Sequence, residues 1–227
     1  MPDPQQLGED RFIATILQIA NWAQKNTRAL ILAVGALAIL IFAVNYYVDY
    51  RQRVRDAATA ELRTIRSQLQ AGNPGQVVDQ LKNFLVQFGD APNAREARVL
   101  LAESLLLVNR AGEAIEPARQ AMGGLGNDIL SLRAAFLLGA AYEETGDTSA
   151  AIGVYERVAE SVDYRVQRTR GLEAAARLHA ARGNTARALA IYDQLTELTP
   201  ADAPARSFYE MRAAELRAES GGSFQGS

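Results

Sequence analysis

Apolar residues form one uninterrupted run near the N-terminus, where residues 29–48 read ALILAVGALAILIFAVNYYV without a charged side chain. A helix of about 20 apolar residues can cross the roughly 30 Å hydrocarbon core of a bilayer. A buried core helix and a cleaved signal peptide are the alternatives. The length and charged flanks argue against the first, and residues 43–45 are a poor cleavage site for the second. The pattern predicts one retained transmembrane helix over residues 29–48.

Amphipathic aromatic side chains flank this run on both sides. Trp22 precedes it, whereas Tyr46, Tyr47 and Tyr50 lie at its C-terminal end. Such rings favour the headgroup region of a membrane. We therefore predict these four residues at the membrane interfaces.

A shorter pattern of helical period precedes the run. In Arg11–Gln24, Phe12, Ile16 and Ile19 share one helical face. Residues 1–28 are thus predicted to form an N-terminal amphipathic segment. Its helix either lies on the membrane surface or docks on a partner subunit.

Helical patterns continue through the rest of the chain. No proline occurs between Trp22 and Asn73, so the spanning helix is expected to run on through a linker helix over residues 49–71. No stretch of alternating β-branched residues predicts a strand, and the fold class is all-α. Further helices are predicted at residues 76–88, 93–109, 112–122, 129–145, 148–161, 165–182, 185–198 and 203–218.

Turn residues between these helices recur at one spacing. Gly72, Asn109, Gly146 and Gly183 are each 37 residues apart. A period of about 20–50 residues is typical of stacked supersecondary units that recognise partners through extended surfaces. The repeat therefore favours a binding protein over an enzyme.

One repeat resembles the tetratricopeptide family, whose first helix has the pattern W-x₂-L-G-x₂-Y. Here residues 135–142 contain Leu138, Gly139 and Tyr142 at that spacing, followed by Ala151 and Tyr155. Small residues such as Gly139 and Ala151 would let paired helices approach closely. The resemblance implies an α-solenoid of about four helix pairs over residues 72–219, with a C-terminal capping helix and a flexible tail over 220–227. The period of 37 exceeds the usual 34 of the family.

The family register also implies which side chains face the inner wall of the superhelix. These candidate partner-binding residues are Arg133, Phe136, Glu143, Arg170, Glu173 and Arg177. A mixed aromatic and arginine surface suits an interface, although ordinary solvated helix faces are the alternative. The lysine and asparagine with which eukaryotic co-chaperone members grip a peptide's C-terminal carboxylates are absent at these positions.

Composition excludes most catalytic chemistry. The chain has no cysteine and one histidine, His179, which is expected to be a structural, hydrogen-bonded side chain. We therefore predict no enzyme activity and no catalytic, cofactor-binding or metal site. A formal net charge of −2 argues against nucleic acid as a partner, and no small-molecule substrate is expected. Pro117 lies in a predicted helix and should kink or end it.

The complete layout resembles the ancillary subunit of the bacterial Sec translocon, an inner-membrane tetratricopeptide protein. That resemblance implies a single-pass protein with its repeat domain in the periplasm. A count of arginines after the span places the domain in the cytoplasm instead, but this rule weakens before long domains. The expected function is a membrane-anchored, chaperone-like scaffold that binds exported or membrane proteins. The alternative is a fixed accessory subunit of a secretion, respiratory or photosynthetic complex.

Overall fold

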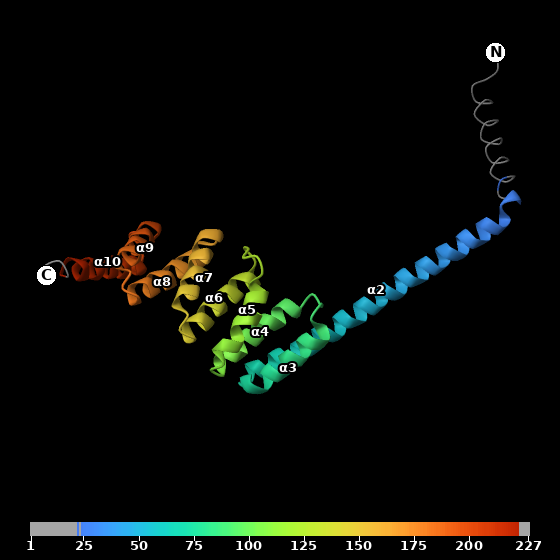
Figure 1. The fold of residues 1–227 in the computed structure, drawn as a ribbon, viewed down its shortest axis with the longest axis horizontal. Helices are drawn as coiled ribbons and strands as arrows, with labels where there is room; N and C mark the ends of the chain where they lie inside the picture. Colours follow the sequence, from blue (N-terminus) through green and yellow to red (C-terminus); the bar gives the residue numbers. More distant parts are fainter. Residues whose placement is uncertain (1–21, 23, 223–227) are drawn as a thin grey trace, which may run out of the picture. The chain divides into compact units, whose positions relative to one another are not determined.

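A computed structural model of the protein describes residue 22 and residues 24–222. The chain divides into two compact units, residues 1–54 and 55–227. Throughout the described residues the secondary structure is helical and contains no strand, which confirms the all-α prediction (Figure 1). Most of the predicted amphipathic helix at 11–24 and most of the predicted tail lie outside the described residues.

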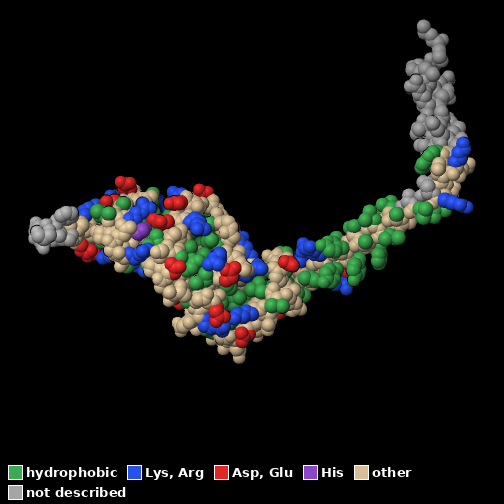
Figure 2. Space-filling view, in the orientation of Figure 1, with side chains coloured by type: hydrophobic (Ala, Val, Ile, Leu, Met, Phe, Trp, Pro, Cys, Tyr) green, Lys and Arg blue, Asp and Glu red, His purple; other side chains and the backbone are tan. Residues whose placement is uncertain are grey.

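The N-terminal unit contains the first part of helix α2 (Thr27–Gln70), which continues without a break into the second unit, as predicted. The large apolar side chains over residues 31–48 are exposed along the helix (Figure 2). Leu32 and Phe42, for example, are each 73% exposed. Trp22, Tyr46, Tyr47 and Tyr50 are also exposed. Among the described helices, α2 alone is long and apolar enough to cross a membrane, by length and composition.

From α3 onward, the C-terminal unit is a series of helices in which each packs against the next along the chain. We call α4, α6, α8 and the end of α2 the first helices of four pairs, and α3, α5, α7 and α9 the second helices. Helix α10 packs on α9 and caps the series. The bounds are α3 (Pro74–Phe88), α4 (Ala94–Leu107), α5 (Ala111–Met122), α6 (Ile129–Glu144), α7 (Thr148–Ser161), α8 (Arg165–Ala181), α9 (Thr185–Leu198) and α10 (Pro204–Gly222).

The four turn residues of the register share one backbone conformation. Gly72, Asn109, Gly146 and Gly183 have φ of 86°, 57°, 80° and 74°. This left-handed conformation is costly for most residues but accessible to glycine and asparagine. At the last turn, the N–H of Asn184 donates to the C=O of His179, which is the long bond of a Schellman helix end. The 37-residue period thus marks the same helix stop in every pair.

Close packing within the third pair depends on Gly139. A Cβ added at Gly139 would lie 2.4 Å from Cζ of Tyr155, a ring on α7 that is 5% exposed. Ala151, on the same helix, is fully buried. The predicted close approach of the two helices at these small residues is therefore confirmed.

Helix α5 continues through Pro117, so of the two predicted effects, a kink or an end, the proline does not end the helix. The helix neither starts nor ends at the proline but extends from Ala111 to Met122. Proline removes one backbone hydrogen bond, yet Ala114, Ala118 and Ala121 are fully buried around it. Tertiary packing of this small-residue face overrides the local preference.

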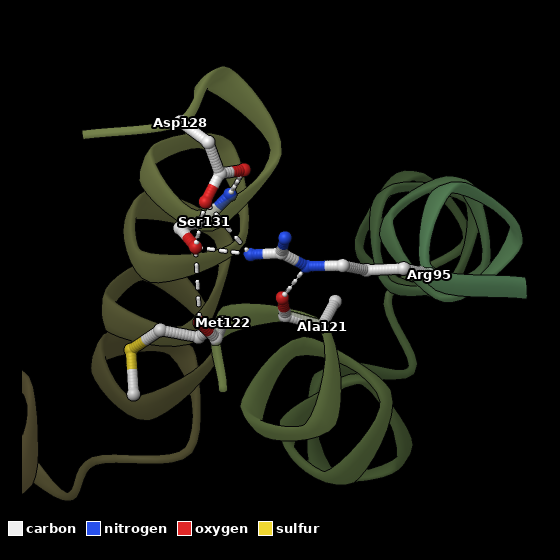
Figure 3. A network of polar contacts seen from close by, with 5 residues as sticks. All are labelled: Arg95, Ala121, Met122, Asp128 and Ser131. Atoms are coloured by element: carbon white, nitrogen blue, oxygen red, sulfur yellow. Dashed lines mark hydrogen bonds and ion pairs between the residues drawn. The ribbon is translucent and has the colours of Figure 1, made fainter. Parts of the chain in front are cut away.

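A polar network fixes the loop between the second and third pairs (Figure 3). Asp128 caps α6 by accepting the Ser131 N–H at 2.9 Å. Arg95 of α4 reaches the same place: its Nε donates to the Ala121 carbonyl at 2.7 Å, and its Nη2 donates to both Asp128 and the Ser131 hydroxyl. Four charge-assisted or capping bonds thereby tie α4, the end of α5 and the start of α6 together.

Candidate partner-binding groove

Two cavities lie along the first helices at the C-terminal end of the solenoid. The first, of about 550 Å³, lies between α6 and the start of α8. The second, of about 730 Å³, extends from α6 and α8 to α10. Phe136 and Arg170 line both. We refer to the two cavities together as the groove.

The groove has a mainly apolar lining with arginines among it. The first cavity is lined by Ile129, Leu132, Arg133, Phe136, Leu137, Tyr164, Gln167 and Arg170. The second is lined by Phe136, Tyr155, Arg170, Glu173, Ala174, Arg177, Tyr192, Phe208, Met211 and Arg212. Apolar concave surfaces with a few polar groups are typical of binding sites.

An aromatic and arginine stack stands where the cavities join. The guanidinium carbon of Arg170 lies 4.8 Å from the centroid of the Phe136 ring. Phe136 in turn packs against Tyr155, with ring centroids 6.1 Å apart and planes tilted by 38°. A cation over an aromatic face is attracted by the ring quadrupole. The Phe136 ring therefore helps to hold the Arg170 guanidinium in place where the two cavities join.

Ion pairs organise the other charged side chains. Arg177 donates to Glu143 at 2.6 Å, and the Tyr155 hydroxyl donates to the other oxygen of Glu143 at 2.8 Å. Burial and this carboxylate raise the pKa of Tyr155, so the phenol remains a donor at neutral pH. The Tyr209 hydroxyl likewise donates to Glu173, on the wall of the second cavity.

The structure brings the six predicted partner-binding residues together. Five of them line the groove. The sixth, Glu143, does not line it but accepts hydrogen bonds from two lining residues, Arg177 and Tyr155. Sequence reasoning missed Ile129 and Tyr164, which are 80% and 52% exposed. It also missed Phe208, Met211 and Arg212 of α10.

The missed residues of α10 have an identifiable cause. Carried forward by 37 residues, Arg170 and Glu173 correspond to Ser207 and Glu210. The groove is instead lined by Phe208 and Met211, one position further along the helix. The capping helix therefore departs from the repeat register, and the sequence signal for this departure is the pair of large apolar side chains Phe208 and Met211.

His179 lies outside the groove and is held by hydrogen bonds. Its Nε2 is 3.3 Å from Glu156 and its Nδ1 is 3.4 Å from the side-chain nitrogen of Asn184. The side chain is 13% exposed, consistent with a structural role. Over the described part of the chain, no cluster of three histidine, cysteine, aspartate or glutamate residues is placed to bind a metal ion.

Comparison with known proteins supports the repeat assignment. Residues 134–168, comprising most of the third pair and the start of α8, match the tetratricopeptide repeat family model. The C-terminal unit is a tetratricopeptide-like solenoid. A search of curated proteins finds no match to the sequence.

Solved tetratricopeptide-like structures share this fold. The nearly identical TPR-like repeats assigned to a kinesin light chain of Podosopora anserina superpose with a TM-score of 0.57 at 17% identity, covering 74% of this chain and 89% of that one. PilF of Pseudomonas aeruginosa gives a TM-score of 0.52 at 20% identity, covering 76% of this chain and 71% of that one. At these identities the likeness concerns the fold alone.

Proposed function

We propose that the protein is a membrane-anchored scaffold that binds segments of exported or membrane proteins in the groove. The observation that carries this proposal is the groove itself: two adjoining apolar cavities on the first helices of a tetratricopeptide-like solenoid, joined at Phe136 and Arg170. The groove has aromatic and arginine side chains near its centre, and these residue types often contribute most of the binding energy of an interface. The role is chaperone-like or translocon-associated.

The anchor in this proposal is residues 29–48. Large apolar side chains of residues 31–48, such as Ile39 and Phe42, are exposed over several turns of α2, and soluble monomers rarely expose so long an apolar surface. Tyr46, Tyr47 and Tyr50 would lie at one membrane interface and Trp22 at the other. We further propose a single-pass protein of the bacterial inner membrane with its repeat domain in the periplasm.

Affinity purification tests the scaffold role. The full chain is purified from membranes in mild detergent, and the co-purifying proteins are identified by mass spectrometry. We expect exported or membrane proteins, and we expect Phe136→Ala to release them while Val86→Ala, on the exposed face of α3, retains them. One stoichiometric complex that is indifferent to Phe136→Ala would favour the fixed-subunit alternative.

Protease protection tests the orientation. Spheroplasts, whose outer membrane has been opened, are treated with a protease. A periplasmic repeat domain is digested, whereas a cytoplasmic one is protected and would remove the proposed link to exported proteins.

A further inference from the structure

Arg170 differs from the other arginines of the groove in its partners. Of the described residues that line the groove, four are arginines and one, Glu173, is acidic. Three of these arginines have carboxylate partners: Arg133 pairs with Glu103, Arg177 with Glu143 and Arg212 with Glu215. In the described part of the chain Arg170 has no ion pair or hydrogen bond, only the Phe136 ring.

The repeat register explains why Arg170 has no carboxylate. Arg133 is its equivalent one repeat earlier, and Arg133 pairs with Glu103, which lies 30 residues before it on the preceding first helix. The position 30 residues before Arg170 is Ala140. The acid that neutralises this arginine in one repeat is thus replaced by a methyl group in the next. Ala140 is half-buried on α6.

We propose that Arg170 binds a carboxylate of the partner, on an extended segment in which an acidic residue is flanked on both sides by large apolar side chains. This inference rests on the proposed function and specifies the partner of the same groove. Charge complementarity supports an acidic ligand, because carboxylates of the chain already pair with Arg133, Arg177 and Arg212, whereas the charge of Arg170 has no such partner among the described residues. Guanidinium and carboxylate form a bidentate, charge-assisted pair.

The position of Arg170 explains the apolar flanks. It lines both cavities, so a carboxylate bound there has an apolar cavity on each side. Ile129, Leu132 and Leu137 line the first cavity, whereas Phe208 and Met211 line the second. One apolar side chain in each cavity would cover surface that is otherwise exposed to water, and burial of that area supplies affinity.

A peptide array tests this specificity with the full chain in lipid nanodiscs. Short synthetic peptides carry glutamate, glutamine or lysine at the centre, flanked on both sides by leucine or phenylalanine, or by serine. We expect binding of the glutamate-centred peptides with apolar flanks. Binding should be at least about tenfold weaker when the centre is glutamine, since a bond to a charged group contributes about 1.4 kcal/mol or more. It should also be weaker when the flanks are serine, since the cavities then bury less apolar area.

Two substitutions at Ala140 supply a matched pair. Ala140→Glu restores the acid of the preceding repeat and should neutralise Arg170 within the chain, lowering affinity for the glutamate-centred peptides about as much as Arg170→Gln does. Ala140→Gln has nearly the same size without the charge and should bind as the parent does. Unchanged circular dichroism in all three variants shows that the fold is intact.

The outcomes separate this inference from the proposed function. Equal binding of glutamate- and glutamine-centred peptides, or full binding by Ala140→Glu, would overturn the carboxylate role of Arg170 while leaving a peptide groove. Absence of any peptide binding, or concentration-dependent self-association abolished by Arg170→Gln, would overturn the inference too. In either case, the affinity purification still tests the scaffold role. If partner proteins co-purify with the parent chain and are lost from Phe136→Ala, the scaffold role stands although the inference about Arg170 is wrong.

Discussion

Gly139→Ala is the smallest change that tests the packing of the solenoid. The new methyl group would lie 2.4 Å from Cζ and 2.8 Å from the hydroxyl oxygen of Tyr155, whereas ordinary contacts begin at 3.4 Å. The ring cannot move freely. It is 5% exposed, packs on Phe136 and donates its hydroxyl proton to Glu143. Helix α6 or the Tyr155 side chain must therefore shift.

Two effects of opposite sign determine the magnitude. Overpacking a filled core costs about 1–3 kcal/mol, whereas replacing a helical glycine by alanine returns up to about 1 kcal/mol. We expect net destabilisation of about 1–2 kcal/mol. The matched control is Gly153→Ala on α7, where the new methyl meets no atom within 4 Å. It should stabilise the protein by about 0.5–1 kcal/mol.

Thermal unfolding followed by circular dichroism measures the difference. A chain of this size shifts its melting temperature by about 2–4 °C per kcal/mol, so Gly139→Ala should lower it by about 2–8 °C and Gly153→Ala should raise it. In a Tyr155→Leu background the clash is absent, and Gly139→Ala should become neutral or stabilising. Additive effects of the two substitutions would refute the assigned contact.

Three further predictions concern the anchor, a buried hydroxyl and acid stability. Deleting residues 29–48 should release a soluble chain with its helical circular dichroism intact, because residues 55–227 form a unit of their own; an insoluble or unfolded product would contradict this. Ser104→Ala should raise the free energy of unfolding by about 1 kcal/mol, since within the described residues the fully buried Ser104 hydroxyl lacks a hydrogen-bond partner; a loss of stability would refute it. Hydrogen bonds from Ser131, with the Arg95 guanidinium, lower the pKa of Asp128 to about 2, so its stabilising effect is complete above its ordinary pKa near 3.9 and is lost as the pH falls towards 2. Asp128→Asn retains a capping side chain and should show a smaller drop in melting temperature between about pH 4 and pH 2; an equal drop would contradict the assignment.

The fold was largely predictable because local signals agree with tertiary packing. The turns at Gly72, Asn109, Gly146 and Gly183 require a left-handed residue, so their spacing alone located the helix pairs. Whether Pro117 kinks or ends its helix could not be decided from the sequence, because the burial of Ala114 and Ala118 beside it depends on packing between helices.

The groove was predictable only in part. Register positions named the side chains of α6 and α8 that face it, yet the capping helix leaves the register at Phe208. The unpaired state of Arg170 could have been inferred from the replacement of Glu103 by Ala140 one repeat later. That inference first requires knowing that Arg133 pairs with Glu103, which depends on a contact between helices.

Site-specific photo-crosslinking in intact cells tests the central claim most directly. A photoreactive amino acid replaces Phe136 in the groove or, as the control, Val86 on α3, which lines neither cavity and is 89% exposed. Membrane fractions are then probed for crosslinked proteins. Our account predicts that the probe at Phe136 captures exported or membrane proteins and that the probe at Val86 does not. Capture from Val86 alone, or recovery of the protein outside the membrane fraction, would contradict it.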